Sequence, residues 1–98
     1  MKQSKLTKAA RGRECQVRIP GVCNGNPETT VLAHYRMAGT CGVGMKPNDL
    51  QGAWACSACH DACDGRSQLI GRAEARQHHA EDVMRTQAIL IREGVVAA

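Results

Sequence analysis

The chain has 98 residues, a formal net charge of +4, six cysteines and only two aromatic side chains, Tyr35 and Trp54. This length fits one small domain and excludes a multidomain enzyme. A core without Phe is thin, so a bound metal or an oligomer interface, such as that of a homodimer, is expected to add stability. The positive charge permits nucleic-acid binding without establishing it.

The amino-terminal sequence MKQSKLTKAARGREC is basic and lacks the apolar region of a signal peptide. No apolar run approaches the length of a membrane span. We therefore expect a cytoplasmic protein without membrane contact. In that compartment clustered cysteines bind metal more often than they form disulfides, so a disulfide framework is the secondary alternative.

In chain order, residues 1–13 are rich in Lys and Arg and predict a basic N-terminal arm, either a solvated tail or a contact to phosphate. Residues 14–98 are expected to form a single domain. It begins with a turn-rich segment, 14–30, followed by a strand over 31–35 and a loop over 36–49. Residues 50–55 predict a second strand, weakened by Gly52, and a helix is expected from Ser57 onward.

Residues 73–93 form the clearest predicted helix, because they contain no Gly or Pro and Gly94 follows as a stop signal. Helical spacing places these side chains near one face, which is expected to be its core face: Ala80, Val83, Met84, Gln87 and Ile91, with Ala73 and Leu90 close by. His78 and His79 point about 100° apart, so they are interpreted as surface or partly buried histidines rather than a ligand pair.

Residues 56–64 read CSACHDACD, and Cys56 and Cys59 in this stretch have the spacing of a metal-binding knuckle. Such a knuckle needs a second cysteine pair, and Cys15 with Cys23 is the preferred one, giving a structural zinc site that would support folding. Two further cysteines remain as alternative ligands, Cys63 at helical spacing from the knuckle and Cys41 in a glycine-rich loop. Cys63 is equally interpreted as a small buried apolar residue.

His60 and Asp64 lie four residues apart, so a helix places them on one face, rotated away from the cysteines. An imidazole and a carboxylate make half a site for a divalent ion and leave positions for water and substrate. Alternatively, they are ordinary surface residues of the helix. His34 on the predicted upstream strand can face this helix and act as a general base on water.

This arrangement resembles the HNH nucleases, also called the His-Me finger or ββα-metal superfamily. The motif LAHYR supplies the first histidine, His34, and CSACH supplies the last, His60, with Asp64 where many members carry a second His. PNDL supplies the middle polar residue, Asn48 or Asp49, and its position before Leu50 favours Asp49. More narrowly, the runs RGRECQVRIPGVCNGNPETTVLAHYR and ACSACHD resemble the YbcO-like nucleases of lambdoid prophages, over most of the chain.

The resemblance implies a small α+β fold, a zinc-stapled ββα-metal core with an additional C-terminal helix. It also implies a metal-dependent endonuclease that hydrolyses DNA phosphodiester bonds. His34 would be the base, Asp49 would orient it through Nδ1–H, and His60 and Asp64 would hold a catalytic Mg²⁺, Mn²⁺ or Zn²⁺. Many members carry a further metal ligand just before the first histidine, where this chain has Ala33.

Arg36, two residues after His34, is expected on the same face of the strand, either as a phosphate contact or as an ordinary surface arginine. Two other functions use the same sequence. One is a non-catalytic, zinc-stabilised nucleic-acid-binding module, which has no need of His34, His60 and Asp64. The other is an interaction protein that recruits a host or phage factor, such as a recombination protein.

Overall fold

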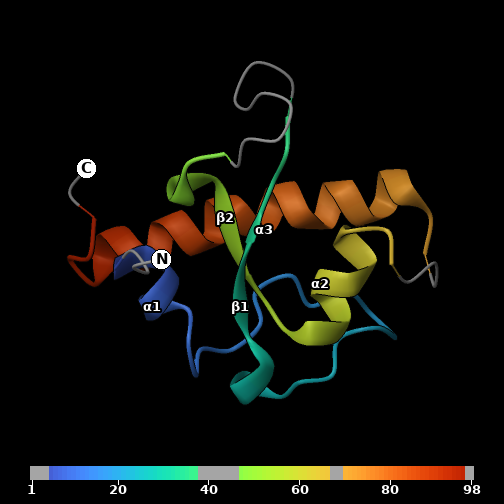
Figure 1. The fold of residues 1–98 in the computed structure, drawn as a ribbon, viewed down its shortest axis with the longest axis horizontal. Coiled ribbons are helices and arrows are strands. Elements are labelled where there is room, and N and C mark those ends of the chain that lie inside the picture. The colour runs from blue at the N-terminus through green and yellow to red at the C-terminus, as the bar shows by residue number, and fades with distance from the viewer. Residues whose placement is uncertain (1–4, 38–46, 67–69, 97–98) are drawn as a thin grey trace.

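The computed structural model describes residues 5–37, 47–66 and 70–96. It is a small α+β structure built around a two-stranded antiparallel sheet and one long helix (Figure 1). The regular elements are α1 (Lys5–Ala9), η1 (Pro27–Thr29), β1 (Val31–His34), η2 (Asp49–Gln51), β2 (Gly52–Ala55), α2 (Ser57–Cys63) and α3 (Arg72–Arg92). The second strand is shorter than expected, because Leu50 and Gln51 belong to the 3₁₀ turn η2.

The sheet is buried on both faces. Leu32 pairs with Trp54, and both pack with Leu90 of α3, while Ala33 pairs with Ala53 and joins the cluster that contains the cysteines. Successive side chains of a strand point to opposite faces, so the two faces cover two different clusters. Gly52 allows the strands to approach, because a Cβ there would lie 2.5 Å from Leu32 Cγ.

Helix α3 lies across the sheet, with α2 beside its amino-terminal half (Figure 1). Its extent agrees with the prediction, but the predicted core face is wrong, since Met84 is 64% exposed and Ile91 is 44% exposed. The buried side chains of α3 are Ala75, His79, Asp82, Thr86 and Leu90. None of the described helices combines the length and the apolar character that crossing a membrane requires.

Polar groups of the buried face explain this difference, because they bond to strand backbone. His79 Nε2 lies 2.8 Å from the Ala33 carbonyl oxygen, and the Trp54 amide donates to Thr86 Oγ1 at 3.1 Å. The hydrophobic periodicity of the sequence does not reveal this buried face, because polar side chains rather than apolar ones hold it against the strands.

Residues 5–13 were expected to belong to a basic arm, but in the structure they pack on the domain. Leu6 and Ala10 contact the cluster of Leu32, Trp54 and Leu90, and Ala10 is fully buried. Arg13 pairs with Glu93 through two contacts of 2.6 Å, and its guanidinium lies 4.8 Å from the centroid of the Trp54 ring. The segment therefore joins the amino-terminal region to the end of α3.

Asp82 of α3 carries a buried carboxyl group whose protonation should control stability. Its Oδ1 accepts a hydrogen bond of 3.4 Å from Thr86, and its Oδ2 has no partner within the described structure. Burial raises the pKa of Asp82 to about 8, against the opposing effect of Arg85. The folded state therefore holds a proton that the unfolded state releases near pH 4, so stability falls as the pH rises toward 8.

We predict that Asp82→Asn removes this pH dependence. Relative to the variant, the wild type should lose about 1 kcal/mol of unfolding free energy per pH unit between pH 6 and 8. Urea unfolding of both proteins across this range measures the difference. Parallel stability curves would show that the buried carboxyl does not titrate on unfolding.

Candidate functional site

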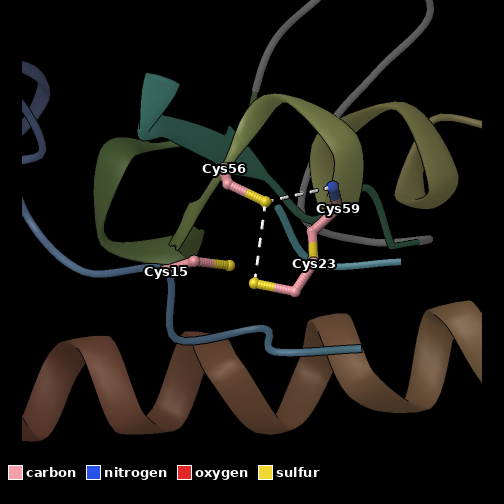
Figure 2. A group of neighbouring side chains, drawn as sticks. All are labelled: Cys15, Cys23, Cys56 and Cys59. Carbon is pink, nitrogen blue, oxygen red and sulfur yellow. Dashed lines mark hydrogen bonds between the residues drawn. The ribbon is translucent and has the colours of Figure 1, made fainter. Parts of the chain in front are cut away.

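The structure brings together four cysteines, Cys15, Cys23, Cys56 and Cys59, at the base of α2 (Figure 2). Their sulfur atoms all lie within 4.8 Å of one another, and the Sγ atoms of Cys23 and Cys56 are 3.9 Å apart. Three of the four side chains are buried, and Cys23 is partly exposed. The four residues are thus positioned to hold one metal ion, in the grouping expected from the sequence.

Backbone amides surround this cysteine cluster. The Arg18 amide lies 3.5 Å from Cys15 Sγ, and Cys56 Sγ accepts from the Asn24 and Cys59 amides at 3.5 and 3.4 Å. Arg18 adopts a positive φ of 50°, which redirects the chain after its amide has contacted Cys15. Hydrogen bonds of this kind favour the thiolate, the form of cysteine that binds metal.

The thiols also affect one another. The hydrogen bond from Cys59 lowers the pKa of Cys15 to about 4. The same bond, seen from Cys59, raises the pKa of that thiol, since it favours the donor remaining protonated. The Cys15 thiolate therefore forms readily in the cluster, whereas the Cys59 thiol favours its protonated form unless a cation compensates the charge.

Cys63 lies outside the cysteine cluster. It is partly buried, packs against the adjoining apolar core, and burial raises the pKa of its thiol to about 12. Its sulfur is not among the four that converge, so the apolar interpretation of Cys63 fits the structure best. Cys41 falls outside the described residues.

A second group of residues stands where β1 meets η2. His34 Nε2 lies 2.7 Å from Asp49 Oδ1, and both side chains are partly exposed. Asn48 instead caps the turn, since its side-chain oxygen accepts from the Leu50 amide at 2.9 Å. Asp49 is thus the partner of His34, but the contact uses Nε2, whereas the expected one used Nδ1–H.

His60 of α2 and Asp64, the C-cap residue of this helix, lie one turn apart. His60 Nε2 lies 3.2 Å from Asp64 Oδ2, so the two potential donor atoms are adjacent, as the spacing predicts. Asp64 also lies 3.4 Å from an Arg66 nitrogen. Within the described residues, only the cysteine cluster unites three or more potential ligand atoms at metal-binding distances, so His60 and Asp64 supply two.

An open pocket of about 290 Å³ connects these elements. It is lined by His34 and Arg36 from the β1 region, by Cys63, Asp64 and Arg66 from the end of α2, and by Arg72, Arg76 and His79 from α3. His60 contributes to this site through its contact with Asp64. Of the residues expected outside the cysteine cluster, His34, Arg36 and Asp64 line this pocket, whereas Asp49 and His60 reach it only through their contacts with His34 and Asp64.

Sequence reasoning missed the contribution of α3 to this pocket. Arg72, Arg76 and His79 are spaced i, i+4 and i+7, which places them on one helical face. This spacing is visible in the sequence and could have predicted that the three side chains share one face. Hydrophobic periodicity obscured it, because it assigned the core to another face of the helix.

The fold and the cysteine cluster define a small α+β domain with four cysteines positioned to hold a metal ion. The family described as "Putative nuclease YbcO" matches residues 4–95, and the chain belongs to this family.

Two relatives are 59% identical to this chain over 93 residues, which is 95% of this chain and 97% of theirs. They are "Putative nuclease YbcO" of Escherichia coli K12 and "Putative nuclease ybcO" of Enterobacteria phage 82. A solved structure described as "Structure of a putative bacteriophage protein from Escherichia coli str. K-12 substr. MG1655" is 54% identical, with a TM-score of 0.79. The match covers 91% of this chain and 99% of that one.

The cysteine cluster generates a prediction with a matched control. Purified protein should hold one metal ion per chain, and Cys56→Ser should lose the ion and unfold at lower temperature, because a buried ligand is removed. Cys63→Ser changes a neighbouring cysteine outside the cluster and should keep the full metal content. Elemental analysis with thermal melts measures both. Equal metal content in the two variants would contradict the assignment.

Proposed function

We propose that this protein is an HNH-type, metal-dependent endonuclease that hydrolyses DNA phosphodiester bonds. The observation that carries the proposal is the His34–Asp49 pair, 2.7 Å apart, in which His34 lines a pocket shared with Asp64 and Arg36. A base, a carboxylate ligand and a cation around one pocket are the groups that phosphodiester hydrolysis requires. The chain order β1, β2, α2 supports an HNH-like ββα core.

His34 is the general base in this proposal. Asp49 accepts a hydrogen bond from Nε2–H, which leaves the lone pair of Nδ1 to take a proton from water. The oxygen of that water attacks the phosphorus, and the bond to the leaving oxygen breaks. The imidazolium that forms is stabilised by the Asp49 carboxylate.

His60 and Asp64 are the residues that would hold the catalytic Mg²⁺, Mn²⁺ or Zn²⁺. Their donor atoms lie 3.2 Å apart, close enough for both to bind one ion. A divalent ion there would stabilise the negative charge that develops on the phosphate and the leaving oxygen. Arg36, on the same pocket, would bind a phosphate oxygen.

Zinc is the ion we propose for the cysteine cluster. Four sulfurs about 2.3 Å from one tetrahedral ion would lie about 3.8 Å apart. The 3.9 Å between Cys23 Sγ and Cys56 Sγ is close to this value. A set of four cysteines is typical of structural zinc, whereas a catalytic ion keeps an open position.

The names of the relatives support a nuclease, and the pocket supports an anionic substrate. Cutting is tested by nicking of supercoiled plasmid with Mg²⁺ or Mn²⁺, and with EDTA as the metal-free comparison. His34→Ala should lower the rate by about 10²–10⁴-fold, because it removes the proton acceptor.

His78→Ala is the matched control, since this half-buried histidine of α3 faces Glu74 and does not line the pocket. It should cut at the wild-type rate. Equal nicking rates for His34→Ala and wild type would reject His34 as the general base. Intact plasmid, single-stranded and branched DNA after incubation with wild type would instead favour a zinc-stabilised binding module.

A further inference from the structure

The pocket beside His34 carries more positive charge than one phosphate group at the reaction centre requires. Four arginines and one aspartate line it. Arg66 is partly neutralised, because it lies 3.6 Å from Asp61 and 3.4 Å from Asp64. Within the described residues, no carboxylate lies at ion-pair distance from Arg72 or Arg76. These two arginines of α3 therefore line the pocket without an ion pair among the described residues.

Arg76 is held in place before any ligand arrives. Its guanidinium lies 4.5 Å from the centroid of the Tyr35 ring, and its Nη2 donates to the Arg36 carbonyl oxygen at 3.1 Å. Tyr35 is itself fixed by an edge contact with His79, with ring centroids 5.1 Å apart. A guanidinium that is already ordered loses little conformational freedom on binding, and it keeps donors for an incoming oxygen.

Arg72 lies one turn earlier on the same face of α3. Its Nη1 would be 3.1 Å from a Cβ placed on Gly65, so its guanidinium lies against the turn that follows α2. Gly65 has a positive φ of 79°, a conformation that glycine adopts readily. The turn after α2 thus leaves room for the guanidinium at the edge of the pocket.

We infer that Arg72 and Arg76 form a subsite for a non-scissile phosphate of the DNA strand being cut. The inference rests on the proposed function and deepens it. The pocket of about 290 Å³ equals roughly ten water volumes, which leaves space beyond the reacting phosphate. Paired, planar guanidinium groups match the oxygens of a phosphodiester. The subsite lies on α3, so it positions the strand from outside the segment that carries His34 and His60.

A binding experiment tests the subsite without cutting. Metal-loaded His34→Ala protein is titrated with a labelled DNA duplex over a range of salt concentrations. Adding Arg72→Gln and Arg76→Gln should weaken binding by about tenfold or more. It should also reduce the slope of log K against log salt by about 0.9, the contribution of one phosphate.

Arg92→Gln in the same background is the matched control. Arg92 is an exposed arginine in the last turn of the same helix, and it does not line the pocket. It should leave the slope unchanged. Arg72→Gln alone gives a variant that spares the Tyr35 contact, so a folding defect of the double variant does not decide the result. A slope equal to that of Arg92→Gln, or no measurable binding before any arginine is changed, overturns the subsite.

Steady-state kinetics of cutting distinguishes the phosphate subsite from the proposed hydrolytic function. A non-scissile contact binds ground state and transition state alike, so the double variant in an otherwise wild-type chain should raise KM and keep kcat. A fall in kcat at unchanged KM would assign the two arginines to the reacting phosphate and overturn the subsite. DNA binding that depends on both arginines in a chain that cuts nothing would support the subsite and reject hydrolysis.

Discussion

The cluster of four cysteines is the constraint on which the rest of the structure depends. It joins the turn-rich segment around Cys15 and Cys23 to the start of α2 at Cys56 and Cys59, on the side of the sheet that contributes only alanines to the core. Because α2 has only seven residues, its own hydrogen bonds do not hold it in place. A metal ion at its first turn would fix the helix, and with it the direction of the histidine that follows.

The second constraint is α3, which bonds to backbone on both sides of the candidate base. His79 contacts the Ala33 carbonyl, one residue before His34, and Arg76 contacts the Arg36 carbonyl, two residues after it. Gln87 donates to the Leu50 carbonyl at 2.6 Å, directly after Asp49. Both partners of the His34–Asp49 pair are therefore braced by a helix that lies outside the ββα order. This arrangement explains why the buried face of α3 is polar.

The sequence predicted the elements that depend on local signals. Cysteine spacing and the histidine motifs led to the cysteine cluster and to the His34–Asp49 contact, because residue type and chain order carry those signals. Prediction from the sequence failed for the features that tertiary contacts determine. The buried face of α3 is set by bonds from His79 and Thr86 to the strands, and residues 5–13 pack because Ala10 reaches a site beside Trp54. Neither the polar contacts of α3 nor the packing of residues 5–13 produces a hydrophobic periodicity in the sequence.

Under the proposed function α2 would serve two separate metals, one held by the cysteines and another by His60 and Asp64. Mn²⁺ binding to zinc-loaded protein, followed by electron paramagnetic resonance, tests it most directly. Asp64→Asn should weaken Mn²⁺ binding roughly 10–100-fold with zinc retained. Asp61→Asn, on the same helix and paired with Arg66, should bind Mn²⁺ like the wild type. Equal Mn²⁺ affinity in both variants, or loss of zinc from Asp64→Asn, would contradict two separate sites.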